Sequence, residues 1–111
     1  MRTLHAVVVA CVLAGCANYG RWGTRAAWEA AVVEHGGTHA ERQLVRQHVA
    51  CVGMTPVQVE LAWGSPNRVV RVQTRHGHGE SWYWVRTVTR WGDVSVRSAH
   101  FSGGVCVAVQ N

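Results

Sequence analysis

The sequence has few acidic residues and lacks the common signatures of catalysis. Six of its 111 residues are Asp or Glu, and Asp93 is the single Asp. No G-x-S-x-G motif is present, and no pair of carboxylates stands out as an acid and base for hydrolysis. Lysine is absent as well, because all eleven basic side chains are arginines. These absences argue against an enzyme, and we expect a protein that carries no catalytic residues.

A hydrophobic run long enough to cross a membrane is also missing. The apolar run Leu4–Ala14 follows the basic residue Arg2 and is interrupted by His5. A spanning helix needs about 20 apolar residues, whereas a secretory signal has a basic start and about 7–15 apolar residues. The N-terminal segment therefore has the layout of a secretory signal.

The end of this run, Leu13-Ala14-Gly15-Cys16, resembles a bacterial lipoprotein signal. The resemblance implies that residues 1–15 are removed and that Cys16 is acylated, with palmitate among its chains, as the first mature residue. Ala17, in place of Asp, resembles lipoproteins sent to the outer membrane. We therefore expect a lipid-anchored protein on the periplasmic face of the outer membrane, the alternative being an ordinary secretory signal with a chance cysteine.

The chain is basic, with a formal net charge of +5. Positive charge favours nucleic acid, anionic lipid or acidic protein partners. Export argues against nucleic acid, which leaves anionic phospholipid or an acidic partner. The alternative is a solvated, mildly basic surface with no specific partner.

Two cysteines remain once Cys11 leaves with the signal and Cys16 carries the lipid. An even pair in an oxidising compartment favours a Cys51–Cys106 disulfide. Such a bridge would stabilise the fold by about 4 kcal/mol in the chain-entropy model. The alternative is two buried free thiols that behave as small apolar side chains.

Local signals predict helices in the first half of the mature chain. Residues 17–24 have no periodicity and look like a tether, and residues 25–35 form a candidate helix that Gly36-Gly37 ends. Thr38 and Glu41 form a capping box that starts a second helix. Thr55, Pro56 and Gln58 give the clearest start, for a helix over residues 56–63.

After Pro66 the period changes to two, which predicts strands over residues 68–74, 81–90, 94–101 and 105–109, with a loop at 75–79. Helices followed by a meander indicate an α+β fold: two, or three, short helices packed on one face of a three- or four-stranded antiparallel sheet. We divide the chain into a signal (1–15), a lipidated tether with a variable segment (16–37) and an α+β domain (38–111).

The later residues resemble the SmpA/OmlA lipoprotein family, whose members are BamE-like. The resemblance rests on Val52-Gly53-Met54-Thr55, Val59, Gly64-Ser65-Pro66, Trp82-Tyr83-Trp84, Phe101 and Gly104-Val105. It implies a fold like that of BamE and of the β-lactamase inhibitor protein BLIP, and partners in the outer-membrane β-barrel assembly machine. Trp63 stands where the family has Leu, and segments 17–37 and 67–80 differ from the family pattern.

Aromatic and basic residues on the central strand are the candidate binding residues. Trp82, Tyr83 and Trp84 place rings on both faces of one strand, of which one face meets the helices and the other is available for contacts. Arg86 shares a face with Trp82 and Trp84, and Arg86, Arg90 and Arg97 would form a basic strip for phosphate or carboxylate groups. The alternative is that these arginines only solubilise an edge.

The histidines do not form a metal-binding pattern. His35 and His39, and His76 and His78, occur in pairs, but the sequence brings no third ligand near either pair, whereas zinc requires three or four. We expect no metal and no cofactor.

These observations together predict a non-enzymatic interaction module in β-barrel assembly and envelope integrity. The alternatives are a lipoprotein that binds or inhibits a secreted enzyme, and one that binds anionic lipid.

Overall fold

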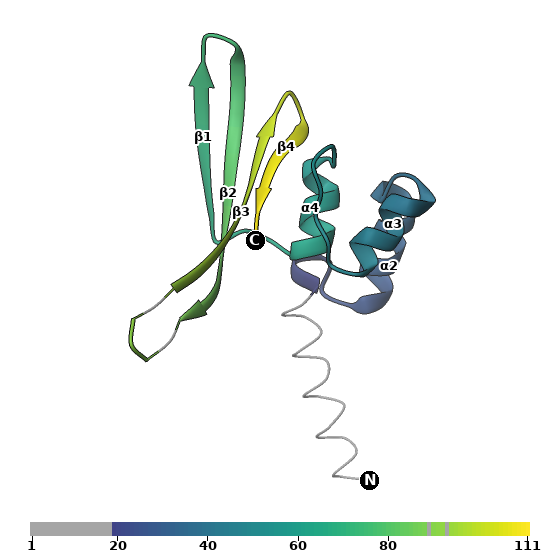
Figure 1. Ribbon diagram of the computed structural model, residues 1–111. Coiled ribbons are helices and arrows are strands. Elements are labelled where there is room, and N and C mark those ends of the chain that lie inside the picture. The colour runs from purple at the N-terminus through teal and green to yellow at the C-terminus, as the bar shows by residue number, and fades with distance from the viewer. Residues whose placement is uncertain (1–18, 89, 93) are drawn as a thin grey trace.

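The computed structural model describes residues 19–88, 90–92 and 94–111, without the side chains of residues 86–88 and 94. The proposed signal and the acylated Cys16 lie outside the described residues. Helices occupy the first half of the described chain, and a four-stranded antiparallel sheet follows with the order β1-β2-β3-β4 (Figure 1). The predicted α+β class is therefore confirmed.

The helical layer holds a 3₁₀ turn and three short helices, whose starts follow the local signals. They are η1 (Gly20–Trp22), α2 (Arg25–His35), α3 (His39–Arg46) and α4 (Pro56–Trp63). Thr24 caps α2 by accepting a hydrogen bond from the Ala27 backbone N–H. Both predicted capping boxes are present, at the starts of α3 and α4, and α4 ends at Gly64. Each box satisfies backbone N–H groups that would otherwise lack partners.

The sheet comprises β1 (Arg68–Thr74), β2 (Gly77–Val88), β3 (Val94–Ser102) and β4 (Val105–Gln110). The loop predicted at residues 75–79 is wrong, because the turn is confined to Arg75-His76 and β2 begins at Gly77. Gly77 and Gly79 pair with Thr74 and Val72, so the glycines that suggested a loop lie inside the ladder. A register shift between Val85 and Thr87 leaves residue 86 without a partner in β3.

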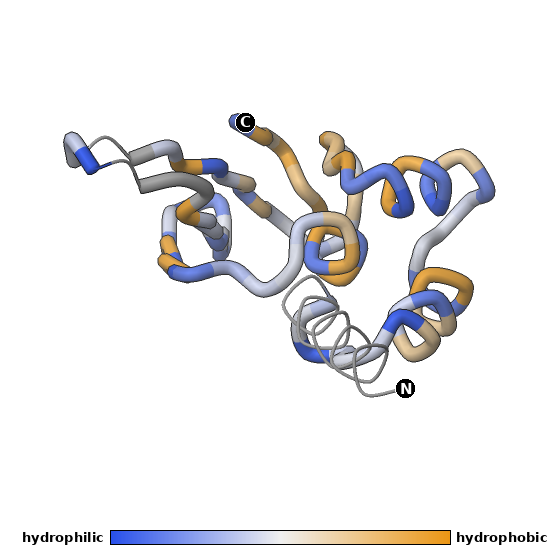
Figure 2. The backbone as a smooth tube through the Cα atoms, turned by 90° about the horizontal axis from the view of Figure 1, so that it is seen from below, coloured by the Kyte–Doolittle hydropathy of each residue, from blue (hydrophilic) through white to orange (hydrophobic). Residues whose placement is uncertain are grey.

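The helices cover one face of the sheet, and the two layers stand side by side when the molecule is turned by 90° (Figure 2). One cluster of buried residues joins them. Its helical members include Trp28, Val32, Val45, Val59 and Leu61, and its sheet members are Trp82, Trp84, Ala99, Phe101 and Cys106. Apolar area buried between the layers is the main stabilising contribution to such a fold.

The packed domain begins earlier than residue 38. Tyr19 and Trp22 pack against the core, and the Tyr19 and Trp28 rings lie 5.5 Å apart. Helix α2 contributes three buried side chains to the same cluster. The expected tether over residues 17–24 is therefore wrong from Tyr19 onward, because aromatic side chains within it find apolar partners on α2.

A buried glutamine connects the three helices. Gln58 in α4 donates hydrogen bonds from Nε2 to the Gly36 carbonyl, at 2.7 Å, and to Glu41, at 3.1 Å. Gly37 has a φ of 84°, and a Cβ there would lie 2.5 Å from that Nε2. Only glycine fits this position, because the backbone is left-handed and the amide lies against it. Gln58, whose side chain completes the capping box of α4, thus also fixes the turn between α2 and α3.

Candidate functional site

Trp82 and Trp84 belong to the core and not to an available binding surface. Their side chains are 9% and 6% exposed. The Trp84 indole N–H donates to the Gly64 carbonyl at 3.0 Å, and its ring meets Trp63 edge-on at 5.1 Å. Trp82 donates to the Glu80 carboxylate at 2.9 Å and lies 4.7 Å from Phe101. The expectation that these two rings dock a partner is wrong in this geometry, because the helices cover their face.

Tyr83 projects from the opposite face of β2, which carries no helix. Its ring stands edge-on to His100 at 6.2 Å, and it is partly exposed. Val85 and Val96, paired across β2 and β3, are 47% and 46% exposed. We call this surface the open face; its central residues are Val70, Ser81, Tyr83, Val85, Val96, Ser98 and His100. Exposed valines near a partly exposed aromatic ring are typical of a surface that binds protein.

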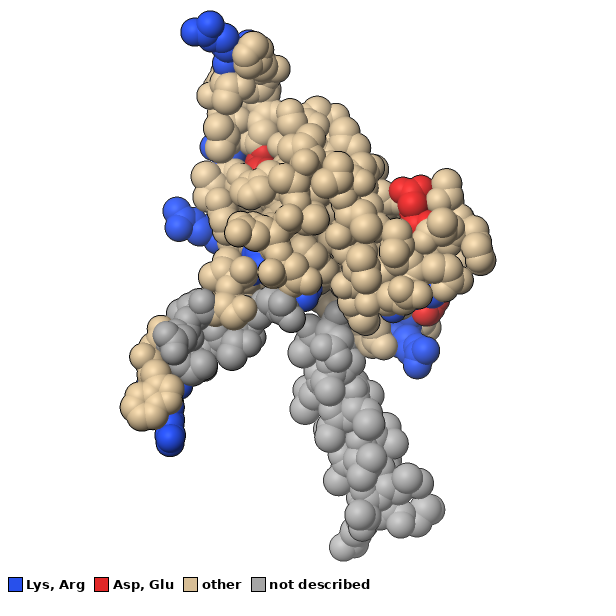
Figure 3. All heavy atoms as spheres, viewed as in Figure 1, with Lys and Arg blue, Asp and Glu red and all other residues tan. Residues whose placement is uncertain are grey.

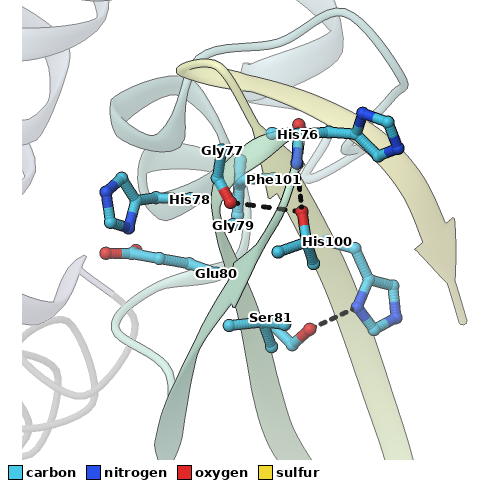
Figure 4. A pocket seen from close by; sticks show the side chains of 11 residues that line it. His76, Gly77, His78, Gly79, Glu80, Ser81, His100 and Phe101 are labelled. Atoms are coloured by element: carbon cyan, nitrogen blue, oxygen red, sulfur yellow. Dashed lines mark hydrogen bonds between the residues drawn. The ribbon is translucent and has the colours of Figure 1, made fainter.

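A serine–histidine pair lies on the open face beside Tyr83. The Ser81 hydroxyl and the His100 Nδ1 are 2.7 Å apart (Figure 4). A nucleophilic serine needs a base that a third group orients. No ion pair of the described residues joins His100 to a carboxylate. The pair therefore bridges two strands, and we assign no chemistry to it.

The loop histidines diverge. His76 and His78 point to opposite sides of the β1–β2 hairpin (Figure 4). Within the part of the chain that the structure describes, no three His, Cys, Asp or Glu side chains gather as metal ligands. The hollow beside the hairpin, lined by Val72, Glu80 and Phe101 among others, is shallow and open.

The predicted basic strip is not continuous. Arg97 lies opposite Trp84 on the covered face of β3, with its guanidinium 4.3 Å from the Trp63 ring centroid and its Nε donating to Asn111. Arg86 falls at the register shift, and its side chain is outside the described residues. Arg90 lies in the β2–β3 turn beside Trp91. The structure thus places Arg97 on the covered face and Arg90 in the turn, and these two arginines do not form one strip.

Sequence reasoning missed Trp22 and Trp91 as functional candidates. Trp91 is 77% exposed, the highest fraction among the large hydrophobic side chains described. The Arg90 guanidinium lies 5.0 Å from the Trp91 ring centroid, and that of Arg21 lies 4.7 Å from the Trp22 ring. The signal was present in the sequence as two Arg-Trp dipeptides, at 21–22 and 90–91.

The two cysteines are free thiols in the structure. Cys106 is buried in β4, and Cys51 is half-buried at the start of a turn. Two backbone hydrogen bonds join that turn to β4, from Gly53 N–H to the Cys106 carbonyl and from Cys106 N–H to the Met54 carbonyl. Burial raises the pKa of the Cys106 thiol, which disfavours the reactive thiolate. The bridge stays a prediction, and an intact mass without reductant, lower by two hydrogens than after reduction, would establish it.

The chain has no recognised relatives in the comparisons with known proteins. No protein-family model, curated protein or solved structure matches it. Among the described residues, none of the helices is both long and apolar enough to cross a membrane. The resemblance to the SmpA/OmlA family therefore rests on the quoted motifs alone.

Proposed function

We propose that this protein is a lipid-anchored, non-enzymatic binding module on the periplasmic face of the outer membrane. The observation that carries the proposal is the Leu13–Cys16 motif, which ends three positions before Tyr19, a residue that packs against the core. A lipidated Cys16 would hold this domain directly at a membrane surface. Several acyl chains at one residue are enough for stable anchoring, since a single chain binds only marginally.

The open face is the surface that best fits a protein partner. It carries Tyr83 near the exposed Val85 and Val96, and it lacks the helices that bury Trp82 and Trp84. Aromatic side chains within an apolar patch contribute much of the binding energy in protein interfaces. The resemblance to the SmpA/OmlA family supports proteins of the β-barrel assembly machine as the partners.

The first test concerns the anchor. Cells expressing the wild-type chain or Cys16→Ser are labelled with radioactive palmitate, and membranes are separated by density. The proposal expects label on the wild-type protein in the outer-membrane fraction and none on the variant. A wild-type protein that takes up no label, or that is released as a soluble form, would contradict the anchor.

The second test concerns the partner. The acylated protein is captured by a C-terminal tag from detergent-solubilised membranes, with Tyr83→Ser compared to Val33→Ser, an exposed change on α2 away from the sheet. The proposal expects assembly-machine proteins at a fixed ratio, reduced by the Tyr83 change alone. If they are absent although the protein is in the outer membrane, inhibition of a cell-wall hydrolase or a β-lactamase is the next assay.

A further inference from the structure

Two Arg-Trp pairs occupy the same end of the molecule. Arg21 and Trp22 form η1, at the lower end of the helical layer in Figure 1, and Arg90 and Trp91 form the turn that extends below the sheet. Figure 3 shows this turn projecting from the body with an arginine at its end. The β1–β2 turn, which holds Arg75, lies at the opposite end (Figure 1).

The position of the proposed anchor identifies what this end faces. Cys16 precedes Tyr19 by three residues, and three extended residues span at most about 11 Å. A membrane that holds acyl chains on Cys16 must therefore lie close to η1. Because the β2–β3 turn projects from the same end, it points toward that membrane too.

The side chains at this end suit a phospholipid surface. Tryptophan is enriched at membrane–water interfaces, where its ring contacts acyl chains and its N–H remains hydrated. Arginine binds phosphate groups through several parallel donors. Trp91 is 77% exposed, and the Arg21 side chain is 57% exposed although it also pairs with Glu60 at 3.5 Å. Arg25, at the start of α2, is exposed as well.

We propose that the Arg90-Trp91 turn is a second membrane contact, which inserts Trp91 into the headgroup region of the bilayer that holds Cys16. Arg21 and Arg90 bind lipid phosphates on either side of the domain. This inference rests on the proposed lipid anchor and adds an orientation to it. The strands then stand upright on the membrane, so the open face is directed sideways, toward proteins embedded in the same bilayer (Figure 1).

The experiment must detect contact between Trp91 and lipid, and not only attachment of the protein to the vesicle, because acyl chains alone hold the protein on vesicles. The mature acylated protein is reconstituted into phosphatidylethanolamine–phosphatidylglycerol vesicles whose acyl chains carry bromine, which quenches nearby tryptophan fluorescence. Wild type is compared with Trp91→Phe, Arg90→Glu and, as a matched charge reversal in the opposite turn, Arg75→Glu. The acyl chains are first verified by intact mass.

The inference expects strong quenching of the wild type and a clear reduction in Trp91→Phe, with the remainder from Trp22 in η1. Arg90→Glu should reduce the quenching, and more so as phosphatidylglycerol replaces the neutral lipid, whereas Arg75→Glu should match the wild type. Equal quenching of acylated wild type and Trp91→Phe would overturn the second contact while leaving the anchor intact. A purified protein without acyl chains would refute the anchor, and the inference with it.

Discussion

Trp84 and Tyr83 are neighbours in β2, yet they belong to two different environments. Trp84 is buried among α4, Trp63 and Trp82, with its indole N–H bonded to the Gly64 carbonyl. Tyr83 lies on the open face near the exposed Val85 and Val96. Alternation along a strand separates a residue that stabilises the fold from one that is available for binding. The difference teaches that an aromatic run on one strand must be divided by face before any of its members is assigned a function.

The largest loss of stability is expected for Trp84→Ala, on the face of the sheet that the helices cover. Truncation of a buried tryptophan removes apolar contacts and leaves a cavity, which costs about 3–5 kcal/mol. The Gly64 carbonyl also loses its donor. Chemical denaturation should therefore show a large fall in the free energy of unfolding. A loss below about 1 kcal/mol would mean that the helices do not cover this face in solution.

A smaller effect is expected for Gln58→Leu, which keeps the size of a buried side chain but removes its polar atoms. The Gly36 carbonyl loses its donor, and Thr55 N–H loses the Gln58 carbonyl oxygen that completes the cap. An unsatisfied buried group and a weakened cap cost about 1–3 kcal/mol together. Urea unfolding checks this, with the exposed Gln73→Leu on β1 as the control. Equal stability of the two variants would contradict the role of Gln58 in joining the helices.

Acidification should also lower the stability of the helical layer. Hydrogen bonds from the Thr38 backbone N–H, the Thr38 hydroxyl and Gln58 hold the pKa of Glu41 below its usual range. A carboxyl with a lowered folded-state pKa contributes stability above its unfolded pKa, and this contribution is lost as the pH falls through the folded value. Thermal unfolding between pH 6 and about pH 3 should show a smaller decline for Glu41→Gln than for the wild type. Parallel declines would show that Glu41 does not contribute.

The smallest effect on stability is expected on the open face. Tyr83→Ser removes a partly exposed ring whose main aromatic neighbour is His100, and we expect a change below about 1 kcal/mol. The same variant should nevertheless lose most partner capture. A large fall in the unfolding free energy, measured by urea titration, would place Tyr83 with the core residues and remove the contrast with Trp84.

Local signals accounted for most of the fold. The helix starts at Thr38 and Thr55 depend on neighbours three residues away, so the sequence alone predicts them. The alternation in β2 predicted which residues share a face. It did not reveal which face the helices cover, because that depends on the packing of the end of α4 against Trp84.

The candidate site was harder to predict because it depends on irregular positions. Arg86 was grouped with Trp84 by strict alternation, but it falls at the register shift after Val85 and its side chain lies outside the described residues. Trp91 lay in a turn that the alternation did not address. Its exposure follows from the length of β2 and β3 beyond the helices, which is a tertiary property (Figure 1).

The two backbone hydrogen bonds at Cys106 also affect association between copies of the protein. An outer strand usually offers unpaired N–H and C=O groups to another strand, which promotes edge-to-edge aggregation. In β4, both backbone groups of Cys106 are already bonded to the turn at Gly53 and Met54. The turn blocks the template near the start of β4, so strand addition over this part of the edge would first have to separate the turn from the sheet.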